Sequence, residues 1–538
     1  MRFPFSVFSR WACELLGAMA LATGCLAAPP PNVVMIFIDD LRADRVGCLG
    51  CPRETTPVLD RFAREGTLFT HAFSQAGWSL PSYSSVMTSL YPPSHGVTTF
   101  ADRLPSAALT LAAVMRANGY RTAAFTGGVH ASRLYGMDNG FEEFHDRPYE
   151  GGFGHTVPAA LEWLRKHADQ PELQARAGGP GLESPGSKIG LASAARERPR
   201  SGAGLGGSAD QPELQARAGG PGLENPGSKI GLASAARDQP RSGTQLDGSA
   251  DQPYFLWLHG YDVNSPCRPP FGLCKLFDPG YAGPVHNSDL LDHLGDTNGL
   301  DPLEPLSEAM KAIMCRPLLE PELTHIQAHY DGAVLTADTW LGVFLETLRM
   351  RGQCANTVFV VASDHGELLG EKGQFGHPRD VAHELLLHVP LVLAGPGVRA
   401  GHRIEEPVEL VDLAPTLLSL CSIAPCARFQ GHSLVPELAA DGPSEPSQAL
   451  AFSSSQQSFS VRSREWRLTR DSNGREALFA PERDPAETLD RSAAHPEVRA
   501  WLTSRLSDWL ESQSARLSPR PVAPGAAEQR LLQNRGYW

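Results

Sequence analysis

Five short apolar runs, separated by helical patterns, restrict the folds that this chain can adopt. The runs are residues 33–38, 122–125, 255–258, 358–362 and 390–394. Continuous apolar runs of this length are typical of strands that are covered on both faces of a sheet. The main helical patterns are residues 57–65, 108–118 and 324–349. This alternation predicts an α/β fold, with a doubly wound, mostly parallel sheet flanked by helices.

The pattern changes after Gly431 to short polar strands and one final helix. These segments are residues 459–462, 466–469 and 497–513. We therefore expect a main domain over residues 29–430 and a smaller C-terminal α+β subdomain over residues 431–538.

The first 28 residues have the pattern of an export signal, because Arg2 and Arg10 precede the apolar residues 15–28. Cleavage after Ala28 would give an exported protein, either periplasmic or secreted. In the alternative interpretation, residues 23–25 form a lipoprotein box and Cys25 carries a lipid anchor.

Charge and hydropathy exclude two other classes of protein. A formal net charge of −13 argues against nucleic acid as a partner, because proteins that bind it normally have a basic surplus. No apolar run of about 18 residues follows the export signal, so we expect no transmembrane domain. Export would also allow disulfides, for which the candidates are the close pairs Cys48/Cys51, Cys267/Cys274 and Cys421/Cys426.

Two tandem copies of a 41-residue unit interrupt the main domain, at residues 169–209 and 210–250. The unit is rich in Gly, Ala, Pro, Ser and Arg and has almost no aromatic or β-branched residues. It cannot bury enough apolar surface to offset its ordering entropy, so we expect residues 169–250 to be a disordered loop. Without it, LEWLRKHA (161–168) joins DQPYFLWLHG (251–260), which is typical of a helix followed by a strand.

Polar residues that suit a metal follow two of the predicted strands. Asp39 and Asp40 come directly after residues 33–38, and Asp364 and His365 follow residues 358–362 after a single serine. In an open parallel sheet, ligands bind in the crevice at the carboxyl ends of the strands. Adjacent carboxylates repel each other unless a cation neutralises them. The pattern predicts one divalent metal ion, held mainly by oxygen.

Ser79 is the candidate nucleophile. It stands just before Pro81, which suits the first turn of a helix, so Ser79 would lie at a helix N-terminus. Free N–H groups there favour an alkoxide and an anionic ester, and a nearby metal would activate the hydroxyl further. The alternative role for Ser79 is that of an N-cap.

Several segments of the chain, in this order, resemble the sulfatase family of the alkaline phosphatase superfamily. Among them are NVVMIFIDDLRADRVGCLG (32–50), WSLPSYSSVMTSLYPPSHGV (78–97), YFLWLHGYDVNSP (254–266) and VFVVASDHGELLGEKGQFGHPRDVAHELLLHVPLVLAGPG (358–397). The resemblance covers nearly the whole chain apart from the export signal and the repeat. It implies an alkaline phosphatase-like fold and a bacterial exported enzyme that hydrolyses sulfate esters.

The resemblance also implies roles for single residues. It places four residues on the metal, namely Asp39, Asp40, Asp364 and His365. The family usually binds calcium there, and a ligating histidine also suits manganese. Ser79 stands where the family has the Cys or Ser that is oxidised to formylglycine, whose hydrate attacks sulfur. Three histidines correspond to positions that contact the sulfate group or protonate the leaving oxygen, namely His130, His259 and His377.

Three positions depart from the family pattern. Tyr83 replaces the signature arginine four residues after the nucleophile, and Gly128 replaces a lysine that is common two residues before His130. Asn264 stands where a histidine is frequent. Since the arginine and the lysine normally stabilise the aldehyde hydrate and the sulfate charge, the resemblance supports the fold and the metal site more firmly than it supports sulfate as the substrate.

Three functions are consistent with these residues. The first is metal-dependent hydrolysis of a small-molecule or glycan sulfate ester through formylglycine made from Ser79. The second is a phosphodiesterase, phosphomonoester hydrolase or phosphonate hydrolase that uses unmodified Ser79. The third is a non-catalytic descendant that binds a sulfated or phosphorylated glycan, which is disfavoured because both metal pairs and the hydroxyl are retained.

Deletion of residues 169–250 should leave a folded protein with unchanged catalytic constants. The deletion joins a predicted helix to a predicted strand, a connection that takes only a few residues. Since closing so long a loop costs roughly a few kcal/mol of chain entropy, the deletion variant should be as stable as the full chain or slightly more stable. Thermal melting and turnover of both proteins test this. A large fall in Tm, or lost turnover in a folded variant, would contradict it.

Overall fold

The computed structural model describes residues 29–167, 252–264, 267, 269–270, 272–283, 317–379, 381–439, 449–513 and 517–534. The expected export signal, the lipid anchor at Cys25, the tandem repeat and Cys315 lie outside these residues. None of the helices in the described ranges is long and apolar enough to cross a membrane.

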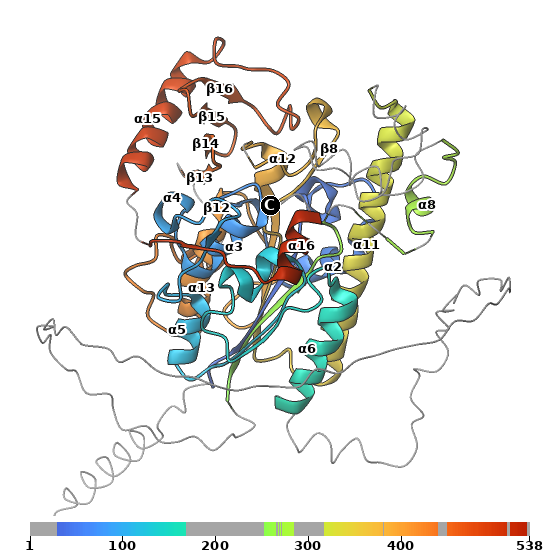
Figure 1. Ribbon diagram of the computed structural model, residues 1–538, viewed down its shortest axis with the longest axis vertical. Helices are drawn as coiled ribbons and strands as arrows, with labels where there is room; N and C mark the ends of the chain where they lie inside the picture. Colours follow the sequence, from blue (N-terminus) through green and yellow to red (C-terminus); the bar gives the residue numbers. More distant parts are fainter. Residues whose placement is uncertain are drawn as a thin grey trace, which may run out of the picture. The chain divides into compact units, whose positions relative to one another are not determined.

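A nine-stranded mixed sheet carries the fold (Figure 1). Its strands, in spatial order, are β11 (His402–Ile404), β2 (Thr67–Phe73), β10 (His388–Ala394), β7 (Thr357–Ala362), β1 (Asn32–Ile38), β6 (Tyr254–Gly260), β4 (Arg121–Phe125) and β5 (Glu143–His145), with β12 (Val408–Glu409) paired to β2. β1 is parallel to both of its neighbours, and β4 is parallel to β5 and β6. The predicted mostly parallel sheet with flanking helices is confirmed.

One predicted strand differs in direction. β10, which contains residues 390–394, is antiparallel to both β7 and β2, although its sequence resembles that of the parallel strands. The connection from β7 to β10 contains only short elements, among them β8 (Leu368–Leu369), β9 (Phe375–Gly376) and α12 (Glu384–Leu387). Antiparallel neighbours need no long crossover helix, whereas parallel neighbours do.

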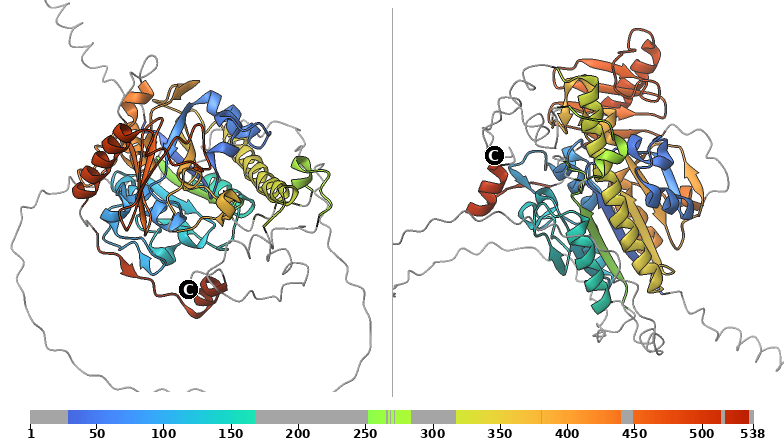
Figure 2. Two further views of the ribbon diagram at one scale, coloured as in Figure 1. Left: turned by 90° about the horizontal axis from the view of Figure 1, so that it is seen from above. Right: turned by 90° about the vertical axis from the view of Figure 1, so that its right-hand side faces the viewer.

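Helices cover the two faces of the sheet in separate layers. α3 (Ser79–Thr88), α5 (Leu111–Ala117) and α13 (Leu413–Leu420) share a core with Val33, Met35 and Phe37 of β1. α2 (Pro57–Glu65), α6 (Phe153–His167) and α11 (Glu320–Met350) share another with Val34, Ile36 and Ile38. Figure 2 shows α6 and α11 on the same side of the sheet, where they contact each other. Burial of alternate residues on opposite faces explains why the strands are apolar throughout.

A separate four-stranded antiparallel sheet lies in the C-terminal part of the chain (Figure 1). It consists of β13 (Ala451–Ser454), β14 (Ser458–Arg462), β15 (Arg467–Asp471) and β16 (Glu476–Phe479). α15 (Pro496–Ser512) packs on it through Leu502 and Leu506. Within the described residues, the other α-helices and strands are α4 (Pro92–His95), β3 (Asp102–Arg103), α8 (Cys274–Phe277), α14 (Val435–Ala439), β17 (Arg520–Pro521) and α16 (Ala526–Asn534).

The seven described cysteines are all free thiols, which corrects the expectation that the close pairs form disulfides. Their spacing in the sequence does not by itself make them reactive, because disulfide formation needs a thiolate. Burial is the main cause that raises the pKa of the Cys48 thiol to about 12, and repulsion by the Asp60 carboxylate is the second. The Cys48 thiol is therefore protonated near pH 7 and reacts slowly.

Glu409, the last residue of β12, links the two sheets. Its buried carboxylate accepts hydrogen bonds from the Tyr91 hydroxyl at 2.7 Å and from the Phe452 N–H of β13 at 2.8 Å. The Gln75 side-chain amide donates a third bond at 3.3 Å. Burial, with the neighbouring Asp412 carboxyl, raises the pKa of Glu409 to about 8.

Glu409→Gln should make the stability of the protein less dependent on pH. The folded-state pKa of about 8 lies above the ordinary value of 4.5. The contribution of the protonated carboxyl is therefore present at low pH and is lost as the pH rises through about 8. The difference in Tm between the variant and the wild type should therefore be more favourable to the variant at about pH 8 than at about pH 5. The same difference in Tm at both pH values would contradict this origin of the pH dependence.

Candidate active site

Two adjacent aspartates follow β1 on a strained turn. Asp39 and Asp40 are 1% and 0% exposed. Asp40 has a φ of 60°, in the left-handed region that residues other than glycine rarely adopt. The Tyr330 hydroxyl of α11 holds the turn, because it donates to the Asp40 carbonyl at 2.6 Å and accepts from the Arg42 N–H at 2.9 Å.

Asp364 and His365 follow β7, which pairs in parallel with β1 and so ends at the same edge of the sheet. The Asp40 N–H donates to Asp364 Oδ1 at 3.3 Å. Asp39, Asp364 and His365 each place one ligand atom so that the three atoms lie within 4.8 Å of one another. The Asp40 carboxylate lies beside this group, with Oδ1 at 2.8 Å from His365 Nδ1.

These four buried side chains fit a divalent cation. Both carboxylate oxygens of Asp40, and Oδ2 of Asp364, are buried without a hydrogen-bond partner. The 2.8 Å contact between His365 Nδ1 and Asp40 Oδ1 does not have the geometry of a hydrogen bond. Burial, and then repulsion by Asp39, raises the pKa of Asp40 and of Asp364 well above the usual range. Burial alone would raise the pKa of Asp39 too, but the hydrogen bond and charge of His259 hold it low. A cation would let all three carboxyls stay ionised. Oxygen donors with one imidazole suit Ca²⁺ or Mn²⁺.

Ser79 is the first residue of α3 and lies against this cluster. Its Oγ is 3.1 Å from His365 Nε2, which is 3.3 Å from Asp364 Oδ2. Extended Trp78 occupies the N-cap position, so Ser79 itself is not the N-cap. Free N–H groups in the first turn of α3 favour negative charge on and near the Ser79 hydroxyl.

Two of the departures from the family pattern converge on one carboxylate. The Tyr83 hydroxyl donates to Asp39 Oδ1 at 3.0 Å, and the Asn264 amide donates to Asp39 Oδ2 at 3.0 Å. His259 Nε2 lies 3.3 Å from Asp39 Oδ1, and the His259 side chain is buried. Asp39 is therefore oriented by the neutral side chains of Tyr83 and Asn264 together with His259.

The other two predicted histidines lie around the cluster at greater distance. His377 Nε2 is 3.9 Å from Asp40 Oδ2, and its ring meets the edge of the His365 ring at a centroid distance of 4.9 Å. His130 is enclosed by aromatic rings, with Trp78 at 5.6 Å and Tyr135 at 5.3 Å. Burial lowers the pKa of both His130 and His377 to about 3, so both are neutral near pH 7. Neutral imidazoles can still donate or accept hydrogen bonds.

Two further residues of this region escaped the sequence analysis. Tyr330 lies within a long helix, and no local pattern distinguishes it from other buried residues of α11. Arg379 stands two residues after His377, and its positive charge contributes to the low pKa of His130 and His377. A basic residue in the same loop as a candidate site histidine was the signal that could have identified it.

A family model described as Sulfatase matches residues 31–423. Arylsulfatase K of Danio rerio is 32% identical over 190 residues, which cover 33% of this chain and 36% of that protein. Arylsulfatase K of Homo sapiens is 35% identical over 115 residues, which cover 21% of each chain. The alignments thus span about a third or less of these relatives.

Solved structures share the fold over nearly the whole chain. The protein BT4656, in complex with its substrate D-glucosamine-2-N,6-O-disulfate, has a TM-score of 0.63 and 17% identity, covering 90% of this chain and 98% of that one. The phosphonate monoester hydrolase of Agrobacterium radiobacter has a TM-score of 0.58 and 20% identity, covering 89% of this chain and 95% of that one.

Chelation should lower the Tm of the wild type, and Asp364→Asn should abolish that response. A metal present at about 100 times its Kd would contribute roughly 2.7 kcal/mol to stability. Asp364→Asn replaces an anionic ligand with a weaker, neutral amide oxygen. Calorimetry of this variant with EDTA, and then with Ca²⁺ or Mn²⁺ added back, should therefore show no shift in Tm.

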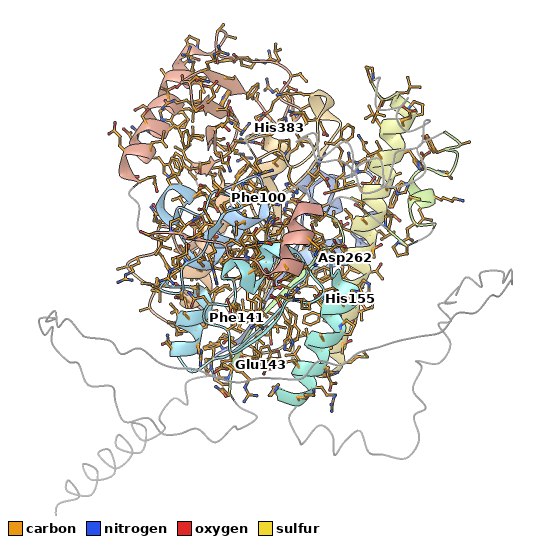
Figure 3. All side chains as sticks on the ribbon, viewed as in Figure 1. Phe100, Phe141, Glu143, His155, Asp262 and His383 are labelled. Atoms are coloured by element: carbon orange, nitrogen blue, oxygen red, sulfur yellow. The ribbon has the colours of Figure 1, made fainter. Side chains whose placement is uncertain are left out.

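Asp262→Asn provides the matched control for this experiment. Asp262 lies just after β6 (Figure 3) and accepts the Phe153 N–H at 2.7 Å, outside the metal cluster. This variant should respond to chelation as the wild type does. An unchanged Tm of exhaustively chelated wild type would contradict the metal site.

Proposed function

Because this chain belongs to the sulfatase family, we propose that it is a metal-dependent hydrolase of sulfate esters in which Ser79 is the nucleophile or its precursor. The observation that carries the proposal is the position of Ser79 Oγ, 3.1 Å from His365 Nε2 at the start of α3 and next to three buried carboxyls. A hydroxyl on an aspartate-rich cation site is suited to attack on an anionic ester.

The proposed division of labour follows from the contacts. Asp39, Asp40, Asp364 and His365 would hold one divalent ion, Ca²⁺ or Mn²⁺, which neutralises charge on the ester when bound. The first turn of α3 would supply N–H donors for the ester oxygens. His130, His259 and His377 would contact the ester group or pass a proton to the leaving oxygen. Tyr83 and Asn264 would act as positioning residues, because they hold the Asp39 carboxylate.

In the preferred form of the proposal, Ser79 is oxidised to formylglycine, whose hydrate attacks sulfur. The ester would be a small molecule or a glycan. BT4656 has a sulfated glucosamine as its substrate, which is consistent with a glycan sulfate. We also propose that residues 29–430 form the catalytic domain, that residues 431–538 form a subdomain, and that residues 1–28 direct export to the periplasm or the medium, with Cys25 as an alternative lipid anchor.

A second candidate function is favoured by Tyr83. Tyr83 stands at the sequence position where the family pattern has an arginine, and its hydroxyl donates to Asp39. A serine nucleophile that stays unmodified does not need this arginine for its maturation. In this alternative the serine hydroxyl attacks a phosphodiester, a phosphate monoester or a phosphonate monoester directly.

Wild-type protein should hydrolyse para-nitrophenyl sulfate, and Ser79→Ala should lower turnover by at least about a thousandfold, since the nucleophile is removed. Peptide mass spectrometry of the segment that contains Ser79 should show a loss of about 2 Da if formylglycine forms. Ser84→Ala is the matched control and should keep near wild-type turnover, because Ser84 lies in the same helix and its hydroxyl donates only to the Leu80 carbonyl one turn earlier, at 2.8 Å.

Each outcome of this experiment distinguishes between the candidates. An unmodified Ser79 with faster turnover of a para-nitrophenyl phosphonate or phosphodiester would favour the second function. Turnover of all these esters by Ser79→Ala at near wild-type rates would exclude Ser79 from the chemistry.

A further inference from the structure

An aromatic column, formed by the rings of Trp78, Phe100 and His130, includes the residue just before Ser79. Phe100 and His130 are stacked, with ring centroids 5.3 Å apart and planes 12° apart. Trp78, the residue before Ser79, is steeply inclined to both rings, at 72° and a centroid distance of 4.8 Å to Phe100, and at 83° and 5.6 Å to His130. Trp78, Phe100 and His130 are 1%, 7% and 4% exposed, so these rings are firmly packed. Phe100 is labelled in Figure 3.

Arg379 continues this column as a partly exposed cation. Its guanidinium carbon lies 3.7 Å from the centroid of the Phe100 ring, within the range of a cation–π interaction. Arg379 is intermediate in burial, whereas Phe100 beneath it is buried. The Phe100 ring thus holds the guanidinium in place, while part of the Arg379 side chain remains exposed to solvent.

The guanidinium lies on the histidine side of the site. Arg379 stands two residues after His377, whose Nε2 lies 3.9 Å from Asp40 Oδ2. The Phe100 ring beneath the guanidinium is in turn stacked on His130, at a centroid distance of 5.3 Å. Arg379 is therefore next to two of the histidines that would contact the ester or its leaving oxygen in the proposed function.

We propose that Arg379, held on the Phe100–His130–Trp78 stack, forms a subsite that binds a second negative charge on the organic part of the ester. The proposal rests on the proposed function, because it uses Ser79 to define where the ester group lies. The ligand class is a doubly anionic ester whose leaving group carries a carboxylate or a further sulfate. Arginine suits either oxyanion, because its planar fork donates two parallel hydrogen bonds.

The combination of aromatic rings with a guanidinium makes this subsite selective for an anionic leaving group over a neutral one. Aromatic rings alone would favour a neutral leaving group over an anionic one, because a ring face repels an approaching anion. The guanidinium reverses that preference on the exposed side of Phe100. A charge-assisted hydrogen bond at a partly buried position corresponds to a change in affinity of about tenfold to a hundredfold.

Two matched esters test the subsite: the sulfate esters of meta-hydroxybenzoate and of meta-hydroxybenzamide, which differ chiefly in the charge of one substituent. Wild type should prefer the benzoate ester in kcat/KM, and Arg379→Gln should lower kcat/KM for this ester by about tenfold or more. The benzamide ester should change by no more than about twofold, because it does not use the charge. Arg379→Lys should retain part of the preference, and added salt should weaken it.

Arg147→Gln is the matched control, since Arg147 also covers an aromatic ring, with its guanidinium 3.8 Å from the Tyr149 centroid and a 61% exposed side chain. It should leave both esters unaffected. Calorimetric binding of free meta-hydroxybenzoate provides a readout that does not depend on turnover. Its affinity should fall in Arg379→Gln and remain unchanged in Arg147→Gln.

The outcomes separate this subsite from the proposed function. If wild type hydrolyses both esters without preference, or Arg379→Gln lowers both equally, the subsite is wrong and the sulfatase proposal stands. If wild type hydrolyses neither ester, the sulfatase proposal fails, and the binding of meta-hydroxybenzoate alone decides the subsite. Equal binding by wild type and Arg379→Gln would then overturn it.

Discussion

The mutual repulsion of three buried carboxyls at one edge of the sheet is the constraint on which the site depends. Asp39, Asp40 and Asp364 are at most 1% exposed, and the pKa values of Asp40 and Asp364 are raised in part by Asp39. Such an arrangement is stable only if the surrounding fold holds it and a cation compensates it. The parallel pairing of β1 with β7, and the Tyr330 clamp on the left-handed turn at Asp40, provide the first of these conditions.

Two neutral donors hold one carboxylate of this cluster. Tyr83 and Asn264 both donate to Asp39, so two positions that depart from the family pattern serve one carboxylate. A tyrosine hydroxyl orients Asp39 without adding positive charge where a metal would bind. The cation Arg379 instead lies on the Phe100 ring of the aromatic column. Under the proposed function, this distribution separates the binding of the ester group from recognition of its organic part.

Most of the fold was predictable because strands that are buried on both faces are apolar at nearly every position, which can be recognised in the sequence. The runs at residues 33–38 and 358–362 correspond to β1 and β7, and the pattern at residues 57–65 corresponds to α2. The direction of β10 was not predictable, because a buried antiparallel strand and a buried parallel strand have the same apolar composition. The free state of the described cysteines was not predictable either, because spacing in the sequence does not determine how their side chains lie in the fold.

The sequence by itself determined which residues stand at strand ends, and therefore that Asp39, Asp40, Asp364 and His365 would be near one another. It also determined that Ser79 begins a helix, because Pro81 follows it closely. Only the tertiary structure decided that Tyr330, from the middle of α11, holds the Asp40 turn, and that Phe100 carries Arg379. The physical reason is that strand ends are defined by local periodicity, whereas these contacts join segments far apart in the chain, whose meeting depends on how helices and loops pack across the sheet.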